Sequence, residues 1–305
     1  MDADHRVRVA VLGAGRMGAA MAERLRQVDF EVSVYNRSPD RAREVAGRIG
    51  AGVAATPAEA ARWASEAGDG TPGAGVLLVS LADDTACREV YLGPDGLVSA
   101  LTTAAVVADT STIDPETARE LAAAVAERGT AMVDAPVSGS VPAALAGSLT
   151  VMVGGDPAAL ERARPVLECI GRRVVHVGGT GTGAVVKLAV NAVVHALNQA
   201  LSEAVVLAEK AGVPLPTFYD VIADSAAAAP FVGYKRQAFE HPESAPVAFS
   251  LDLVGKDLRL ILQLADRVGA PMAQARTGLD TVDRAVRSGL GDADMSALAL
   301  LLREA

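Results

Sequence analysis

The feature that most restricts the fold is an alternation of short apolar runs with amphipathic stretches over the first 178 residues. Short apolar runs bounded by turn residues are typical of buried strands, and the stretches between them are typical of covering helices. Chains with this order form a largely parallel sheet. We therefore predict an α/β doubly wound domain, with strands at 7–12, 31–35, 76–80, 105–109, 131–136, 149–153 and 174–177.

A glycine-rich segment, 178–183, closes the alternating region and predicts a flexible junction. Beyond it we find no convincing strand, so residues 179–305 are predicted to form an all-α C-terminal domain. That domain opens with a long interdomain helix at 184–210, which spans about 40 Å at 1.5 Å per residue and is apolar around most of its circumference. The predicted domains are thus residues 1–178 and residues 179–305.

Polar residues interrupt this apolar helix at 187, 191, 195, 198 and 202, a spacing that places them on one stripe. A membrane span tolerates few such interruptions, so we reject that interpretation in favour of a buried helix. The stripe is expected to line a cleft or an interface. Part of the apolar surface is expected to bury against a second subunit, in a homodimer or a homotetramer.

The net charge of −9, from 28 Lys and Arg against 37 Asp and Glu, repels phosphate backbones and acidic membranes. We therefore expect neither nucleic acid nor a membrane as a partner. Two cysteines are too few for a disulfide framework, and the polar N-terminus shows no export signal, so a cytoplasmic location is expected. His5, His176 and His241 lack the spacing of metal ligands, and no metal site is predicted.

The first predicted strand ends in a G-x-G-x-x-G loop that passes directly into a helix whose apolar residues Met21, Ala22, Leu25 and Val28 share a face. In this context the glycines allow a tight turn and let a pyrophosphate approach the helix N-terminus. We predict a Rossmann-type dinucleotide site, although a glycine turn without a ligand is the alternative. The predicted cofactor contacts from this loop are Gly13, Gly15, Arg16, Met17 and Gly18.

The second predicted strand ends in Asn36, Arg37 and Ser38, at the place where an NAD site has Asp or Glu for the ribose hydroxyls. A planar guanidinium flanked by polar side chains suits a ribose 2′-phosphate instead. We therefore predict NADP as the cofactor, with NAD less favoured. The alternative is that Arg37 is a solvated residue near a turn.

Ligands of open parallel sheets bind outside the carboxyl ends of the strands, where this chain has three further polar loops. The first contains Leu81, Ala82 and Asp83, which are predicted cofactor contacts, and the second contains residues 109–112. The third contains the turn of residues 138–140, whose backbone N–H groups would suit a carboxylate. A capped turn that holds no anion is the alternative for this third loop.

Only four of the 28 basic residues are lysines, at 187, 210, 235 and 256. Lys187 and Asn191 lie one helical turn apart on the long helix. Hydride reduction of a carbonyl develops negative charge on oxygen, which an ammonium can protonate while a carboxamide orients the group. The alternative is a lysine that is ion-paired within an interface.

In order and spacing these motifs resemble the β-hydroxyacid dehydrogenase family, which includes 3-hydroxyisobutyrate dehydrogenases, tartronate semialdehyde reductases and glyoxylate/succinic semialdehyde reductases. The resemblance covers nearly the whole chain and rests on the segments 13–18, 109–113, 134–140, 183–191 and 256–258. It implies that Lys187 is the catalytic acid/base with Asn191 as its helper. It further implies substrate or cofactor contacts from Thr112, Ser138, Gly139, Ser140 and Lys256, and a pocket near Phe231 and Tyr234.

Two departures from the family pattern concern substrate and cofactor choice. Ser140 and Val190 stand where many relatives carry Gly and Asn, and together with residues 36–38 they resemble the NADP-dependent glyoxylate/succinic semialdehyde branch. Imine reductases share the fold, but their pattern has Asp or Tyr at the place of Lys187. A catalytically silent NADP-binding scaffold is a further alternative, and relatives of that kind tend to have lost the lysine.

Overall fold

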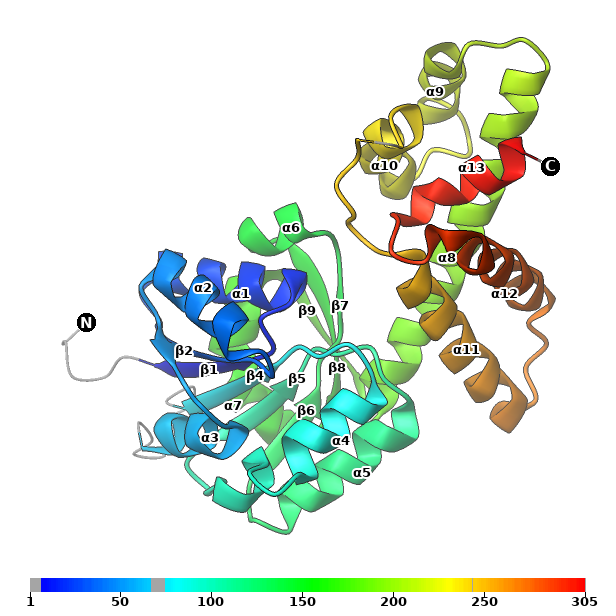
Figure 1. The fold of residues 1–305 in the computed structure, drawn as a ribbon. Coiled ribbons are helices and arrows are strands. Elements are labelled where there is room, and N and C mark those ends of the chain that lie inside the picture. The colour runs from blue at the N-terminus through cyan, green and yellow to red at the C-terminus, as the bar shows by residue number, and fades with distance from the viewer. Residues whose placement is uncertain (1–6, 67–74, 243, 305) are drawn as a thin grey trace. The chain divides into compact units, whose positions relative to one another are not determined.

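The computed structural model describes residues 7–66, 75–242 and 244–304. The chain divides into two compact units, of which one reaches to Lys187 and the other begins at Leu188. The N-terminal unit is a sheet with covering helices, and the C-terminal unit is built from helices (Figure 1). This architecture confirms the prediction of an α/β domain followed by an all-α domain.

The sheet of the N-terminal unit has the strand order β3-β2-β1-β4-β5-β6-β8-β7, with β9 paired to β8. The pairs are parallel except for β8 with β6 and with β7, which are antiparallel. The strand order reverses beside β1, and such a switch point is where open α/β sheets bind ligands. The strands are β1 (Arg8–Leu12), β2 (Glu31–Tyr35), β3 (Gly52–Val53), β4 (Gly75–Val79), β5 (Val106–Asp109), β6 (Ala131–Asp134), β7 (Val137–Ser138), β8 (Leu149–Gly155) and β9 (Gly171–Gly178).

Helices connect these strands and cover both faces of the sheet. They are α1 (Arg16–Gln27), α2 (Pro39–Ile49), α3 (Pro57–Ser65), α4 (Asp84–Leu92), the short helix η1 (Leu97–Ala100), α5 (Pro115–Ala126), α6 (Val141–Leu145) and α7 (Pro157–Ile170). The predicted apolar face of α1 is confirmed for Met21, Ala22 and Leu25, which are buried. Val28 is the exception, because it follows the last turn of α1 and is 40% exposed.

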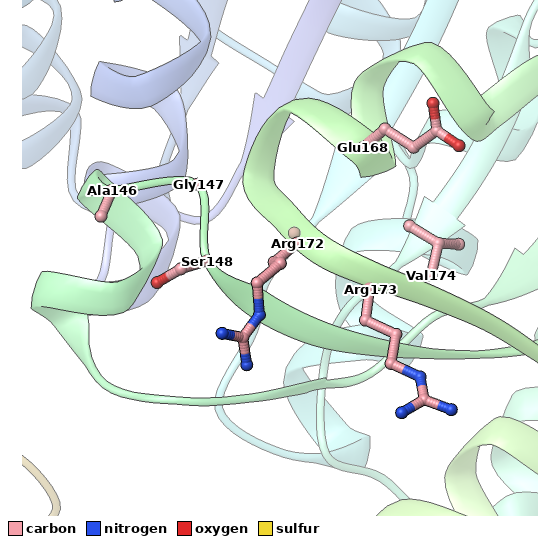
Figure 2. Close-up of a pocket in the computed structure, with 8 residues that line it drawn as sticks. Ala146, Gly147, Ser148, Glu168, Arg172, Arg173 and Val174 are labelled. Carbon is pink, nitrogen blue, oxygen red and sulfur yellow. The ribbon is translucent and has the colours of Figure 1, made fainter.

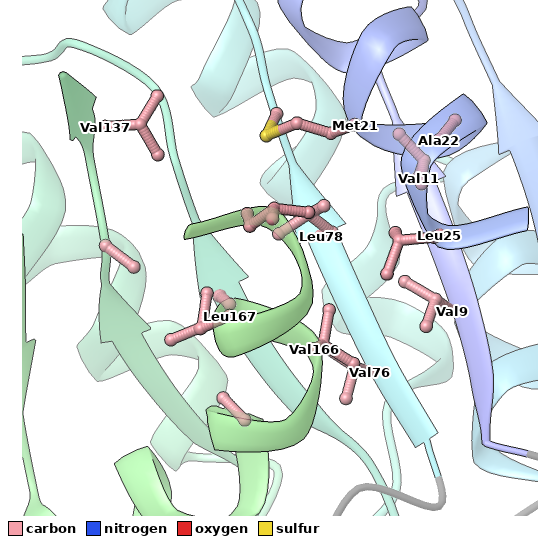
Figure 3. Close-up of a cluster of buried hydrophobic side chains, with 14 of the residues drawn as sticks. Val9, Val11, Met21, Ala22, Leu25, Val76, Leu78, Val137, Val166 and Leu167 are labelled. Carbon is pink, nitrogen blue, oxygen red and sulfur yellow. The ribbon is translucent and has the colours of Figure 1, made fainter. Parts of the chain in front are cut away.

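The sheet separates two apolar cores because successive side chains of a strand point to opposite faces. Val9 and Val11 belong to the core on the side of α1 and α7, which Figure 3 shows. Ala10 and Leu12 belong to the core on the other side, with residues of α3, α4 and α5. Burial on both faces explains why the strands read as continuous apolar runs in the sequence.

The C-terminal unit has its own apolar core and, among its described residues, no strand beyond the isolated bridge between Ser250 and Asp294. Its first helix, α8, begins at Thr182 in the N-terminal unit and ends at Lys210. The other helices are α9 (Leu215–Ala223), α10 (Pro230–Glu240), α11 (Leu251–Val268), α12 (Ala273–Ala285), η2 (Val286–Leu290), η3 (Met295–Ala297) and α13 (Leu298–Arg303).

Helix α8 is long and apolar enough to cross a membrane, judged by length and composition alone. Its polar stripe nevertheless has partners inside the protein. Asn198 Nδ2 donates to the Met295 carbonyl oxygen at 3.0 Å, and Ser202 Oγ donates to the Asn198 carbonyl oxygen at 2.7 Å. Both side chains are buried, so this part of the stripe packs inside the helical unit, which agrees with the expectation of an interface and not with that of a cleft.

Candidate active site

The loop between β1 and α1 needs glycine at two positions for packing and leaves open space at a third. A Cβ on Gly13 would lie 2.1 Å from the Ser80 carbonyl oxygen, and one on Gly18 would lie 1.9 Å from the Gly13 carbonyl oxygen. Gly15 is exposed, and a Cβ there would meet no atom within 4 Å. The first and last glycines therefore hold the loop against the sheet, and the middle one lies at the open surface.

The N-terminus of α1 fits the phosphates of a dinucleotide. Gly15 is its N-cap and supplies no side-chain hydrogen bond, and the first turn contains no acidic residue. The N–H groups of a first helical turn lack intrahelical partners and carry partial positive charge, which favours a phosphate there. Arg16 is exposed and Met17 half-buried at this helix start, and their contacts with the cofactor stay predictions.

A hydrogen-bonded asparagine and two arginines follow the end of β2. Asn36 Oδ1 accepts a hydrogen bond from the Ala14 N–H at 3.0 Å, so this side chain fixes the glycine loop. The Arg37 side chain is 80% exposed, and its Nη1 lies 3.9 Å from a Glu89 carboxylate oxygen. Arg41, on α2, donates from Nε to the Ala14 carbonyl oxygen at 3.0 Å.

Sequence reasoning missed Arg41. Its position four residues after Arg37 was the available signal, but the contact with the loop depends on the fold. Ser38 is the N-cap of α2, makes no side-chain capping bond and is exposed. The end of β2 thus gathers two cations beside the glycine loop, and none of the residues 36–38 carries a carboxylate.

The loops after β4 and β5 are tied to each other by hydrogen bonds. The Leu81 N–H donates to Ser111 Oγ at 2.9 Å, and the Ser111 N–H donates to Asp109 Oδ1 at 2.8 Å. Asp109 is buried and also accepts from the Tyr91 hydroxyl at 2.9 Å, and burial raises the pKa of its carboxyl. Thr112 directly follows this network and is half-buried, and its contact with a ligand stays a prediction.

Two predicted cofactor contacts in the loop after β4 have different surroundings. The Asp83 carboxylate caps α4 by accepting from the Ala86 N–H at 2.8 Å, which gives it a structural role. Ala82 is exposed in the same loop. Their contacts with a cofactor stay predictions.

The turn of residues 138–140 links β7 to α6. Gly139 has a φ of 143°, and a Cβ there would lie 2.6 Å from Leu149 Cδ2, so this position needs glycine. Ser140 is the N-cap of α6 and makes no side-chain capping bond, and Ser138 and Ser140 are both half-buried. Helix α6 has only five residues, so its dipole adds little, and carboxylate binding here stays a prediction.

Lys187 and Asn191 follow each other by one turn on α8. Lys187 is half-buried, whereas Asn191 is buried and donates from Nδ2 to Asp257 Oδ2 at 2.6 Å. The carboxamide that we predicted to orient substrate is therefore itself oriented by a carboxylate of α11. Asp257 falls in the segment 256–258 that carries the family resemblance, but the sequence alone indicates no role for it.

Asp257 is the centre of a buried polar group in the helical unit. Its Oδ1 lies 2.9 Å from Lys256 Nζ, and its Oδ2 lies 3.5 Å from His195 Nε2. His195 is buried beside the Phe249 ring, with 5.9 Å between ring centroids, and neither ring nitrogen hydrogen-bonds a described residue. From the sequence, His195 is expected to be a hydrogen-bonded histidine at a helix interface, with a relay on the polar stripe as the alternative. The helix interface is present, but neither ring nitrogen makes a hydrogen bond within the described residues.

Phe231 lies in the core of the helical unit, packed edge-on against Tyr234 with 5.5 Å between ring centroids. Phe231 is buried and Tyr234 is exposed, so the aromatic pair reaches from the core of the helical unit to its surface. Substrate contact from either ring stays a prediction.

A surface pocket lies apart from all of the predicted site residues (Figure 2). It is bordered by the segment between α6 and β8 and by the start of β9. Its lining residues are Ala146, Gly147, Ser148, Glu168, Gly171, Arg172, Arg173 and Val174. Among the described residues, no three His, Cys, Asp or Glu side chains come together as a metal ion would require.

Family models match nearly the whole chain. The NAD binding domain of 6-phosphogluconate dehydrogenase matches residues 8–178, and a model described as "NAD-binding of NADP-dependent 3-hydroxyisobutyrate dehydrogenase" matches residues 181–302. The chain is 35% identical to 3-hydroxyisobutyrate dehydrogenase of Pseudomonas aeruginosa, over 94% of this chain and 93% of the relative. It is 32% identical to glyoxylate/succinic semialdehyde reductase 1 of Arabidopsis thaliana, over 95% of this chain and 96% of the relative.

A solved structure agrees with these matches. That of Mycobacterium tuberculosis 3-hydroxyisobutyrate dehydrogenase with L-serine has a TM-score of 0.82 and 30% identity, and covers 98% of this chain and 99% of its own. The fold and the dinucleotide loop thus define an NAD(P)-dependent oxidoreductase. Together with the helical unit and its relatives, they show that the chain belongs to the β-hydroxyacid dehydrogenase family.

Proposed function

We propose that this enzyme reduces a small carboxylate-bearing aldehyde or ketone with NADPH, and catalyses the reverse oxidation, with Lys187 as the proton donor and acceptor. The observation that carries the proposal is the position of Lys187 early in α8. The start of that helix is hydrogen-bonded to Asp134 at the end of β6. On this basis we assign the Lys187 ammonium to the carboxyl edge of the sheet, where ligands of this fold bind.

The reaction adds a hydride to the carbonyl carbon and a proton to its oxygen. A bound nicotinamide supplies the hydride, and the residues of this chain supply the proton and the orientation. The Lys187 ammonium would give its proton to the oxygen as negative charge develops there, and would take one back in the oxidation. Asn191, held by Asp257, would orient the reacting group. A guanidinium could not replace Lys187, because it hardly ever releases a proton.

The substrate class follows from the groups that we assign to the site together with Lys187. We assign the substrate carboxylate to Ser138, Gly139 and Ser140, and a further contact to Thr112. Lys256 would approach the substrate or cofactor from the helical unit. Substrates of the 3-hydroxyisobutyrate, glyoxylate or succinic semialdehyde type match these groups, because each carries a carboxylate beside the reacting carbon or a short distance from it.

Spectrophotometry of NADPH oxidation tests the proposal and its alternatives. The substrates are glyoxylate, succinic semialdehyde, tartronate semialdehyde, methylmalonate semialdehyde and a cyclic imine. We expect turnover with at least one of the carboxylate-bearing carbonyls and none with the imine. Turnover of the imine alone would make the protein an imine reductase, and no oxidation with any compound would favour the silent scaffold.

The preference for NADP rests on Arg37 and Arg41. Arg37 lies just after β2 and Arg41 lies in the first turn of α2, and a 2′-phosphate beside them would accept charge-assisted hydrogen bonds. We expect Arg37→Ala to weaken NADPH binding about 10-fold or more, as removal of a charged hydrogen bond does, and to change NADH binding far less. Equal weakening of both cofactors, measured by fluorescence titration, would contradict the assignment to NADP.

We further propose that the enzyme is a homodimer or a homotetramer that binds neither nucleic acid nor membranes. Two apolar side chains of α8, Val193 and Leu207, are 62% and 71% exposed in the single chain. Large apolar side chains on a long helix favour burial against a partner. Sedimentation velocity at micromolar concentration is expected to show an oligomer, and a single monomeric species would overturn this proposal.

A further inference from the structure

The Asp134 carboxylate holds the start of α8. This residue ends β6 and is buried. Its Oδ1 accepts a hydrogen bond from the Gly181 N–H at 2.7 Å, and its Oδ2 accepts one from the Ala184 N–H at 2.9 Å. Both oxygens of one side chain are thus bonded to backbone at the N-terminus of the helix that carries Lys187.

Two hydrogen bonds to one rigid carboxylate restrict the position of the helix start more than a single bond would. The first N–H groups of a helix have no intrahelical partners, and a carboxylate beside them also interacts favourably with the helix dipole. Because the two donors are three residues apart, a rotation or an axial shift of α8 would lengthen at least one bond. Burying a carboxylate without such partners costs free energy, so the arrangement in which both Asp134 hydrogen bonds are made is favoured.

Glycines let the helix start approach the sheet backbone. A Cβ on Gly183 would lie 2.5 Å from the Asp134 carbonyl oxygen and 2.6 Å from the Met152 carbonyl oxygen. One on Gly154 would lie 2.7 Å from Asp134 Oδ1. The expectation that residues 178–183 form a flexible junction is therefore wrong at Gly183, where glycine serves close packing.

We propose that Asp134 is the positioning residue for Lys187. Lys187 follows Ala184 by three residues, so it lies one turn further along the same helix face as Ala184, whose N–H bonds to Asp134. Misplacement of a reacting group by about 1 Å lowers rates by about 10²-fold. This inference rests on the proposed role of Lys187, and the experiment below also measures the anchor without catalysis.

The first pair of variants is Asp134→Asn with Asp156→Asn as its control. An asparagine at 134 keeps the shape and loses one of the two acceptors. Asp156 is a helix cap in the same unit that accepts from the Ala158 N–H at 2.8 Å at the start of α7, so its capping bond is to α7 and not to α8. We expect Asp134→Asn to lower kcat about 10²-fold with the Kd for NADPH within about 3-fold, and Asp156→Asn to leave kcat within about 2-fold.

The second pair serves if Asp134→Asn does not fold. Gly183→Ala places a methyl group against the Asp134 carbonyl oxygen, whereas a Cβ at Gly179, in the same segment, would meet no atom within 4 Å. We expect Gly183→Ala to lower kcat at least 10-fold and Gly179→Ala to leave it unchanged. Equal losses in the two alanine variants would indicate a need for flexibility and would overturn the proposal.

Hydrogen exchange measured by mass spectrometry tests the anchor directly in the enzyme without substrate. Peptides covering residues 181–187 should exchange faster in Asp134→Asn than in the wild type, and those at the start of α7 should exchange faster in Asp156→Asn. Normal kcat in Asp134→Asn, or unchanged exchange at 181–187, would overturn the proposal. If Lys187→Ala itself kept normal turnover, the proposed function would fail while the exchange result still decided the anchor.

Discussion

Two lysine–aspartate pairs of the helical unit have the same residue types in different surroundings. Lys235 Nζ lies 2.6 Å from Asp294 Oδ1 and 2.8 Å from its Oδ2, and both side chains are buried. Lys256 Nζ lies 2.9 Å from Asp257 Oδ1, and the lysine side chain is 23% exposed while the aspartate is buried. The Lys235–Asp294 pair is thus buried, whereas the lysine of the Lys256–Asp257 pair reaches solvent.

The surroundings of each carboxylate explain the difference. Asp294 also accepts from the backbone N–H groups of Ala248 and Phe249, at 2.9 Å and 3.2 Å, so the first pair joins α10, the 248–249 segment and η3. Such a buried pair is stable only when its geometry is good and its other hydrogen bonds are made. Asp257 instead binds Asn191 and stands beside an ammonium that reaches the surface, as a residue must to contact a ligand. Because the two lysines differ in exposure, we predict a structural role for Lys235 and a ligand contact for Lys256.

The largest expected effect is at Lys187, whose substitution should lower the catalytic rate without lowering stability. Lys187→Ala removes the proposed proton donor, and we expect kcat to fall by roughly 10²–10⁴-fold, with NADPH binding and the unfolding temperature little changed. Lys187→Arg keeps the positive charge and should be nearly as inactive. Steady-state kinetics and calorimetry on the same samples check both variants, and an active arginine variant would mean that charge alone suffices.

Lys235 should behave in the opposite way. Lys235→Met leaves the Asp294 carboxylate buried without its cation, which is expected to lower the free energy of unfolding by about 3–5 kcal/mol. The kcat of the folded fraction should be unchanged. Lys210→Met, at the exposed end of α8, is the matched control and should change stability by less than about 0.5 kcal/mol. Urea unfolding measures both, and similar values would break the comparison.

Lys256 should show an intermediate pattern. We expect Lys256→Met to raise the KM for the carboxylate substrate about 10-fold, which corresponds to about 1.4 kcal/mol of lost binding, with a smaller effect on kcat. The lysine end of this ion pair is partly exposed but Asp257 is buried, so the loss of stability should be about 1–3 kcal/mol, less than for Lys235→Met. A loss of stability as large as that of Lys235→Met, with KM unchanged, would place Lys256 with the structural lysines.

The smallest expected effect is a difference in pH dependence between two buried aspartates. Burial alone would raise the pKa of Asp294, but the Lys235 ammonium and backbone N–H groups hold that pKa below its usual value. The ionised carboxylate thus favours the folded state, so its contribution is present above the ordinary aspartate pKa and is lost as pH falls through the lowered value. Burial raises the pKa of Asp109, so its contribution is present below the ordinary value and is lost as pH rises through the raised one.

Urea unfolding of the wild type, Asp294→Asn and Asp109→Asn between about pH 3 and pH 7 measures this difference. The stability gap between the wild type and Asp294→Asn should widen as pH rises. The gap between the wild type and Asp109→Asn should narrow over the same range. Two gaps that change in the same direction would show that the two carboxylates do not differ as described.

Much of the fold was predictable because it depends on local pattern. The seven predicted strands are present, with ends that differ by a few residues, and residues beyond 178 are helical. The strands β3 and β7 were missed because two residues carry no periodicity. The glycine segment was misjudged because glycine serves both flexibility and close packing, and only the neighbouring backbone distinguishes them.

The supporting carboxylates of the site were not predictable in the same way. Asp134 lies 47 and 50 residues from its two backbone partners, and Asp257 lies 66 residues from Asn191. An aspartate in a sequence does not indicate what it will bond across such separations. The same limit applies to Arg41, whose partner belongs to the glycine loop.

The sequence by itself determined the alternating domain, the dinucleotide loop, the polar stripe of the long helix and the scarcity of lysine, because each depends on residues close together in the chain. It also carried the family's motifs, which the comparisons confirm at the level of a dehydrogenase. Only the tertiary structure decided which charges are buried, which carboxylate holds the start of α8 and which orients Asn191. Burial and long-range hydrogen bonds arise when distant segments pack, and no local pattern encodes them.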